Sequence, residues 1–251
     1  MKHRDLFFYV VGICAFTFAG NQARANECLV NGSPYWEPIS FLSKAGKHGG
    51  IMSDVAVKIG ETSGITITLG PKVGWEQLLR DLDTGKLGIL GGLYHNEERS
   101  KKYAYSHPVT ESNIKIFVKK GSEFDYAELK DLKGKKGIRT RGGSLGQVFD
   151  DYDKKHLKLE KISPSRNLIF KILLAGRADY AVMGQRDGET RMRHELFQNK
   201  ITMLSTSVEV NEIFFVFSKK SPCFKHFTEF NAALLRLKKR GVVDKIVKSY
   251  P

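Results

Sequence analysis

Short apolar segments alternate with longer amphipathic segments along most of this chain. The short segments have the composition of strands, and the longer ones place apolar side chains at helical spacing. Strands that alternate with helices predict an α/β protein with mostly parallel sheets. We expect strands at residues 28–30, 65–69, 87–90, 114–118, 137–138, 180–183 and 212–218, and helices at 52–62, 75–83, 97–103, 126–132, 145–152, 166–175, 189–197, 224–240 and 242–250.

The N-terminus has the layout of a secretory signal peptide. A basic start at residues 2–4 precedes an apolar run at 6–19 and the small-x-small sequence Ala23-Arg24-Ala25. The apolar run is shorter than the ~20 residues of a spanning helix, although an uncleaved anchor is the alternative. We expect cleavage after Ala25 and a soluble periplasmic protein that begins at Asn26, because no later apolar segment is long enough to cross a membrane.

The chain is basic, with a formal net charge of +14. Such a charge favours anionic partners, which include nucleic acid, membrane surfaces and small anions. The basic residues are spread along the chain, however, without zinc-finger spacing, an aromatic-basic ribonucleoprotein motif or a basic tail. We therefore predict a solvated basic surface and no nucleic-acid binding.

Two cysteines, Cys28 and Cys223, remain after the predicted processing. In an oxidising compartment an even pair suggests one disulfide, which would join the N-terminal strand to the C-terminal segment. Two separate buried thiols are the alternative. The Cys and His residues lack metal-ligand spacing, so we expect neither a metal site nor a cofactor.

Several short motifs follow one another in a set order along the chain. They are Pro34-Tyr35-Trp36-Glu37-Pro38, Gly50-Ile51-Met52-Ser53-Asp54, Trp75-Glu76-Gln77-Leu78-Leu79, Gly85-Lys86, Gly91-Gly92, Glu98-Arg99, Tyr105-Ser106-His107-Pro108, Asp131-Leu132-Lys133-Gly134-Lys135 and Gly176-Arg177-Ala178-Asp179. Taken in this order they resemble the bacterial extracellular solute-binding proteins of family 3, the periplasmic receptors typified by amino-acid uptake systems. The resemblance covers essentially the whole mature chain.

The resemblance implies a two-lobed periplasmic-binding-protein-like fold. Two α/β lobes would be joined by two crossover strands, with the ligand cleft between them. Lobe one is expected at 26–109 plus 211–251, and lobe two at 110–210. A monomer would close on its ligand by hinge motion, and the permease of an ABC importer would recognise the closed form.

Arg99 is the first candidate for ligand binding. The matching arginine of the family holds a ligand carboxylate, and a planar, permanently charged guanidinium can bond both carboxylate oxygens. The alternative is a solvated arginine at a helix start, which is an unfavourable place for a cation.

The sequence Gly142-Gly143-Ser144 precedes a predicted helix. Free backbone N–H groups at a helix start can bind an anion, and Ser144 would add a hydroxyl. An ordinary N-cap serine is the alternative. Arg141 beside this loop would either add a second positive contact or face water.

Aromatic residues are the candidates for the wall around the ligand. Tyr35, Trp36 and Trp75 could hold the ligand body, or could pack in the core. Gly92 and Tyr94 match the segment that lines the cleft before the arginine. Family members often have Ser or Thr at these two places, where this chain has glycine and tyrosine.

The largest departure from the family lies in lobe two. Amino-acid receptors of the family carry an aspartate that bonds the ligand ammonium, and Gly184 stands at that place. Asp187 lies three residues on, and Glu37 or Glu212 could substitute. An unpaired ammonium is costly to bury. The ligand is then either an anion without an ammonium group or an amino acid held differently.

Three functions follow from these residues. The leading one is a binding protein that captures a small polar, carboxylate-bearing metabolite, an amino acid or organic acid, for ABC-type uptake, without catalysis. The second is a ligand-sensing or partner-binding periplasmic protein without a transporter. The third is a dehydratase-like enzyme on the same scaffold, which would need a positioned general acid; the glycine at 184 argues against it.

Overall fold

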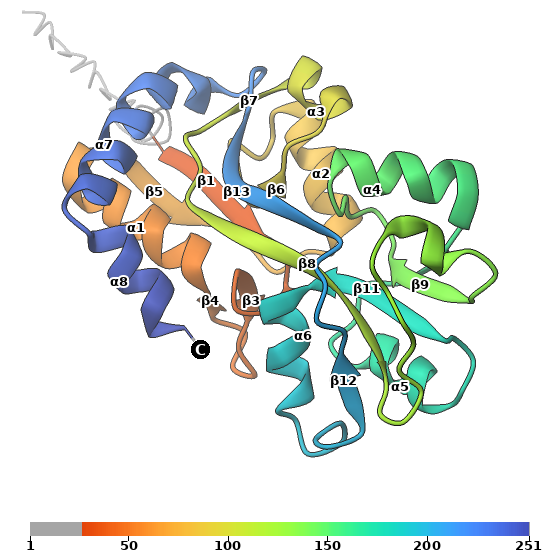
Figure 1. Ribbon diagram of the computed structural model, residues 1–251. Coiled ribbons are helices and arrows are strands. Elements are labelled where there is room, and N and C mark those ends of the chain that lie inside the picture. Colours follow the sequence, from red (N-terminus) through yellow and green to blue (C-terminus); the bar gives the residue numbers. More distant parts are fainter. Residues whose placement is uncertain (1–26, 251) are drawn as a thin grey trace, which may run out of the picture.

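The computed structural model describes residues 27–250, so the predicted signal peptide and its cleavage site lie outside the described residues. A mixed ten-stranded sheet runs through the molecule (Figure 1) in the order β10-β9-β11-β8-β13-β6-β1-β5, with β12 paired to β8 and β7 paired to β13. Its strands are β1 (Glu27–Gly32), β5 (Thr66–Leu69), β6 (Ile89–Tyr94), β7 (Tyr103–Tyr105), β8 (Thr110–Lys119), β9 (Gly137–Thr140), β10 (Glu160–Ile162), β11 (Tyr180–Gly184), β12 (Ile201–Met203) and β13 (Glu209–Ser218).

The helices are packed around this sheet, and a small three-stranded sheet lies beside it. The helices are α1 (Ile51–Ser63), α2 (Trp75–Thr84), α3 (Glu97–Lys102), α4 (Gln147–Tyr152), α5 (Leu168–Leu174), α6 (Gln185–Met192), α7 (Phe227–Lys239) and α8 (Val242–Ser249), with shorter turns η2 (Leu129–Leu132), η3 (Asp153–Leu157) and η4 (Pro222–His226). The small sheet consists of β2 (Tyr35–Trp36), β3 (Ser40–Leu42) and β4 (His48–Gly49).

Two long antiparallel strands, β8 and β13, connect the two halves of the sheet. The first half of β13 pairs with the first half of β8, from Glu209 opposite Ile114 to Ile213 opposite Thr110. The second half of β13 then pairs with β6 and β7, whereas the second half of β8 pairs with β11 and β12. These are the two crossover strands that the resemblance implies, and they divide the molecule into two α/β lobes. The exact lobe limits, 26–109 plus 211–251 and 110–210, remain a prediction.

The alternation of side chains along the strands builds a core on each face of the sheet. In β13, Phe215 and Phe217 pack on one face with α1 and α7, and Phe214 and Val216 pack on the other face with α2. Successive strand side chains point to opposite faces, so a strand that is apolar throughout has to be covered on both faces. In lobe two, β11 is likewise buried along its whole length, with α5 packed on one face.

A disulfide joins Cys28 of β1 to Cys223 of η4, with 5.3 Å between their Cα atoms. The predicted pairing is confirmed, and the alternative of two separate thiols is wrong. The bond ties the first strand of lobe one to the segment that precedes its C-terminal helices, and both cysteines are buried in the core of that lobe.

Several predicted elements differ from the structure in kind or in extent. The predicted helix at 126–132 is only a short turn, η2, and the predicted helix at 189–197 begins earlier, as α6, directly after β11. The predicted helix at 224–240 is interrupted after η4, whose start at Pro222 is capped by the Ser221 hydroxyl. The strand predicted at 87–90 runs instead through 89–94, because its pairing with β1 and β13 includes Gly91 and resumes on β13 after a bulge at Gly92.

Within residues 27–250, none of the helices combines the length and the apolar composition that a membrane span needs.

Candidate ligand-binding site

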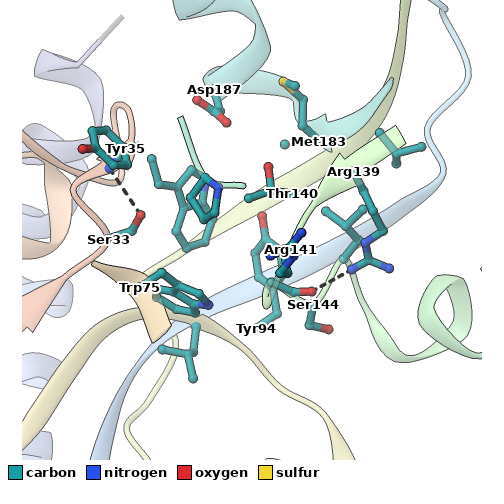
Figure 2. Close-up of a pocket in the computed structure, with 18 of the residues that line it drawn as sticks. Ser33, Tyr35, Trp75, Tyr94, Arg139, Thr140, Arg141, Ser144, Met183 and Asp187 are labelled. Carbon is teal, nitrogen blue, oxygen red and sulfur yellow. Dashed lines mark hydrogen bonds between the residues drawn. The ribbon is translucent and has the colours of Figure 1, made fainter. Parts of the chain in front are cut away.

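A cavity of about 110 Å³ lies between the two lobes. Strands β1, β6, β9 and β11 all lead into it with their carboxyl ends, and the segments that follow them form much of its wall. In open α/β sheets, this edge is where ligands bind. Figure 2 shows Tyr35 and Trp75 of lobe one on one side of the cavity and Arg139 and Ser144 of lobe two on the other.

The structure brings together nearly all of the ligand-binding residues that the sequence predicts. With the exception of Gly142, all of them line the cavity: Tyr35, Trp36, Trp75, Gly92, Tyr94, Arg99, Arg141, Gly143, Ser144 and Gly184. They come from segments that are far apart in the sequence. Their contact with a ligand remains a prediction.

Aromatic rings form one wall of the cavity. The Trp36 and Tyr94 rings meet edge to face, with centroids 5.2 Å apart. Gly92 lies beneath Trp36: its φ of +94° favours glycine, and an added Cβ would lie 3.1 Å from the indole ring. Trp36 and Tyr94 are therefore positioned by each other and by Gly92. A planar apolar wall of this kind suits the body of a small metabolite.

Tyr94 is a buried, uncharged hydrogen-bond donor. Its hydroxyl donates to the Oγ of Ser112 on β8 at 3.0 Å, and burial raises the pKa of Tyr94. The phenol therefore stays neutral at any physiological pH. The ring lies where β6 approaches β8 and β11.

Arg99 reaches the cavity from α3. The side chain of Asn96 caps this helix by accepting from the Arg99 N–H at 2.9 Å. The Arg99 guanidinium donates to the carbonyl of Gly142 at 3.3 Å, and among the described residues it forms no ion pair. Its charge is therefore available to an anion in the cavity.

Gly142 takes a different role from the one predicted. It does not line the cavity; instead its carbonyl accepts from Arg99 and from the Trp75 Nε1–H at 3.0 Å. Both donors belong to lobe one, so this carbonyl joins the two lobes. Its φ of +76° and the 2.9 Å that an added Cβ would leave to the Trp75 ring both require glycine here.

The helix that follows the predicted anion-binding loop begins at Gln147, not at 145, and carboxylates lie at its start. Asp150 accepts from the N–H of Leu145 at 3.2 Å, and Glu209 accepts from the N–H of Phe149 at 3.0 Å. These carboxylates lie at the positive end of the helix, where a negative charge is favourable.

The loop before α4 nevertheless keeps two free donors. Within residues 27–250, the N–H groups of Gly143 and Ser144 have no acceptor. The Ser144 hydroxyl is not an N-cap: it donates to Asp150 at 2.5 Å and accepts from the N–H of Gly146 at 3.2 Å. The backbone of the loop, more than the serine hydroxyl, is thus the part that can bind an anion.

Arg139 on β9 is a buried residue of the cavity wall that sequence analysis missed. Its guanidinium bonds to Asp150 at 2.7 Å, to Asp153 at 3.1 Å and to the carbonyl of Gly143 at 2.8 Å. It therefore fixes the loop that carries the free amides. The sequence did contain a signal for this ion-pair cluster. Two aspartates, 150 and 153, lie three residues apart after a predicted strand that contains an arginine.

Asp187 and Arg191, one helical turn apart on α6, form a second buried ion pair in the wall. Arg191 bonds both Asp187 oxygens, at 2.8 and 3.2 Å, and also donates across the cleft to the carbonyl of Tyr35 at 2.9 Å. Burial raises the pKa of Asp187, and the Arg191 charge opposes this. Sequence analysis named Asp187 as a substitute carboxylate but missed Arg191, although their spacing is that of a helical ion pair.

Exposed Arg141 follows β9 at the rim of the cavity. Its guanidinium donates to the carbonyl of Lys161 at 3.3 Å and, among the described residues, pairs with no carboxylate. Both predicted alternatives therefore hold for Arg141, since it borders the cavity and is also solvated.

Glu37, which the sequence offers as a substitute carboxylate, forms an ion pair with Arg166 at 2.7 Å across the cleft. It is therefore not a free carboxylate of the cavity wall.

Two lobes joined by paired crossover strands, with a polar and aromatic cavity between them, define the class of two-lobed α/β binding proteins. The chain belongs to the bacterial extracellular solute-binding proteins, family 3, whose family model matches residues 29–251. The family assignment that the sequence motifs suggest is confirmed, and so is the two-lobed α/β fold. The prediction of mostly parallel sheets is wrong, because the crossover strands β8 and β13 pair antiparallel with all of their neighbours.

Two relatives of the chain carry binding-protein names. The chain is 32% identical to the L-cystine-binding protein TcyJ of Escherichia coli (strain K12) over 118 residues, which are 47% of this chain and 42% of that protein. It is 23% identical to a probable amino-acid ABC transporter-binding protein of Haemophilus influenzae, over 68% of this chain and 66% of that protein. The chain thus spans less than two thirds of the length of these relatives.

Solved structures share the fold. A histidine kinase sensor domain with similarity to periplasmic binding proteins superposes with a TM-score of 0.79 at 22% identity, covering 91% of this chain and 97% of that one. At this identity the likeness shows the fold alone.

Proposed function

We propose that this chain is a periplasmic solute-binding protein that captures a small carboxylate-bearing metabolite between its lobes for ABC-type uptake. The observation that carries the proposal is the arrangement around the Arg99 guanidinium. It faces a cavity that also presents the free amides of Gly143 and Ser144 and an aromatic wall.

A carboxylate matches these donors. Charge-assisted hydrogen bonds to an ionised group are roughly twice as strong as neutral ones, and a guanidinium can bond both carboxylate oxygens. The donors come from both lobes, with Arg99 from lobe one and the two amides from lobe two. A bound carboxylate would therefore hold the lobes together.

Contacts across the cleft support closure around a ligand. Arg99 and Trp75 bond the Gly142 carbonyl, Arg191 bonds the Tyr35 carbonyl, and Arg166 pairs with Glu37. All of these residues lie outside the crossover strands. A hinge motion in β8 and β13 would break these contacts together and open the cavity.

Capture without catalysis fits the groups in the cavity. Asp187, the one acidic side chain that the described part of the chain places in the wall, is held by two nitrogens of Arg191, so it is poorly placed to transfer a proton to a ligand. The family and the named relatives support a binding role. Delivery to an importer and a periplasmic location rest on the predicted signal peptide and on the name of the H. influenzae relative.

A thermal-shift screen of the chain from Asn26 onward tests this proposal. A ligand present at a hundred times its Kd should stabilise the fold by ~2.7 kcal/mol. For a chain of this size that corresponds to a rise in Tm of roughly 5–10 °C. The screen should cover amino acids, organic acids, sugars and nucleosides. We expect the stabilising compounds to carry a carboxylate.

The control is the Arg99→Ala variant, measured with the same compounds. Stabilisation that persists in this variant would place the ligand elsewhere. A folded protein that no compound in the panel stabilises, and that carries no co-purified molecule, would contradict the proposal.

A further inference from the structure

The charges in the cavity wall are unequally compensated. Among residues 27–250, four arginines and one aspartate line it. Arg139 is matched by Asp150 and Asp153, and Arg191 is matched by Asp187. Among the described residues, Arg99 and Arg141 form no ion pair. The wall therefore offers positive charge to a ligand and already uses its own negative charge.

Asp187 is a poor partner for a ligand cation because of its position. Both of its oxygens accept from Arg191, which itself is fixed by the carbonyls of Ser165, Arg166 and Tyr35. A ligand ammonium beside Asp187 would therefore also lie near the Arg191 guanidinium. Two cations within a few ångströms repel each other strongly in a site of low dielectric constant.

The wall at Gly184 is uncharged. An added Cβ at this residue would lie 2.9 Å from the Ser112 Oγ, 3.5 Å from the Tyr94 hydroxyl and 3.8 Å from the Trp36 Nε1. Gly184 has φ of −61° and ψ of 139°, which any residue adopts, so the backbone does not require glycine. The Ser112 Oγ is the atom that would crowd a Cβ here, and the Tyr94 hydroxyl lies at ordinary contact distance beyond it, so the two side chains border the room that a longer side chain at 184 would use.

Tyr94, which lines the cavity and bonds to Ser112, makes this end of the cavity a neutral one. Burial keeps the phenol protonated, and its hydrogen goes to Ser112. Groups of this kind suit a carbonyl or hydroxyl of a ligand. An ammonium here would be buried without a counter-charge, which is costly.

We propose that the ligand is a carboxylic acid without an ammonium group, such as an α-keto or α-hydroxy acid, and that Tyr94 and Gly184 together set this preference. The inference rests on the proposed function, since it concerns the same cavity.

Matched compound series test the inference. Each series has one side chain and differs only at the α-carbon: alanine, pyruvate and lactate; leucine, α-ketoisocaproate and α-hydroxyisocaproate; glutamate, α-ketoglutarate and α-hydroxyglutarate. Isothermal titration calorimetry gives the Kd of each with the protein. In every series that binds, the keto or hydroxy acid should bind at least tenfold more tightly than the amino acid.

A double variant, Gly184→Asp with Tyr94→Ser, should reverse this preference. It removes the ring and places a carboxylate in the vacated space, so the amino acid should gain at least tenfold relative to its keto acid. Tyr94→Ser alone is the matched control, and should not favour the amino acid. Circular dichroism and thermal unfolding without ligand check that each variant is folded.

The outcomes separate the inference from the proposed function. Tighter binding of the amino acid by the wild-type protein overturns the inference and leaves the proposed function standing. If every stabilising compound in the broad screen carries an ammonium group, the inference is also overturned and the proposed function still stands. A broad screen in which nothing binds contradicts the proposed function itself, and the inference fails with it.

Discussion

Replacing Arg99 by alanine should raise the Kd for the ligand by at least 30-fold. Removal of one partner from a hydrogen-bonded charge pair in a largely desolvated site costs about 2–5 kcal/mol. Arg99 is half-buried in the cavity wall and, within the described chain, its only side-chain partner is the Gly142 carbonyl. Most of its charge is therefore left for the ligand. Calorimetric titration of the wild-type protein and of the Arg99→Ala variant measures the change.

Two further variants show how Arg99 acts. Trp75→Phe removes the other donor to the Gly142 carbonyl and keeps an aromatic ring in the wall, so it reports what the cross-cleft bond contributes. A neutral hydrogen bond is worth about 0.5–1.5 kcal/mol, which predicts a loss of less than about 15-fold. Arg99→Lys keeps the charge without the planar fork, and should fall between wild type and alanine. An Arg99→Ala variant that binds like wild type would contradict the carboxylate role.

Loss of the disulfide between Cys28 and Cys223 should lower the free energy of unfolding by about 2–5 kcal/mol. The bond joins residues 195 positions apart, so it limits the unfolded chain over most of its length. In the folded state it holds β1 against η4, where Cys223 also packs on Gly88. For a chain of this size, a fall in Tm of roughly 5–20 °C is expected.

Differential scanning calorimetry of Cys28→Ala, Cys223→Ala and the double variant measures this loss. Either single change breaks the bond, so the two effects should be far from additive, and the double variant should be close to each single one. Reduction of the wild-type protein should lower its Tm in the same direction. Additive single effects together with a Tm that reduction leaves unchanged would contradict the pairing.

Regular elements with a clear period were predictable from the sequence. Trp75, Leu78 and Leu82 recur at helical spacing before Gly85, and the structure has α2 there with Gly85 as its left-handed C-cap. The run of Ile213 to Phe217 is apolar throughout, which predicts a strand covered on both faces, and β13 is such a strand. In these segments local pattern and burial agree.

Elements that depend on distant partners were not predictable. β2, β3 and β4 are two or three residues long and are strands only because they pair with one another. Helix α4 starts at Gln147, later than predicted, because the Asp150 carboxylate bonds Ser144 and Leu145 and so holds the preceding loop in a turn. A carboxylate that bonds backward along the chain leaves no period in the sequence.

The candidate site also has a part that the sequence predicts and a part that it does not. Residues of the wall could be named from motifs, because each motif fixes where its segment enters the cleft. The partners of those residues could not. Arg139 and Arg191 act through Asp150, Asp153 and Asp187, and only the folded chain brings these charges together. The role of Gly142 depends on a donor 67 residues away, in the other lobe.

A crystal structure of the protein with the best compound of the thermal-shift screen tests the central claim most directly. We expect the compound between the lobes, its carboxylate within hydrogen-bond distance of Arg99 and of the amides of Gly143 and Ser144, and its body against Trp36. A compound bound outside this cavity, for example in the polar hollow between Asn113, Arg186 and Lys248, would contradict the account.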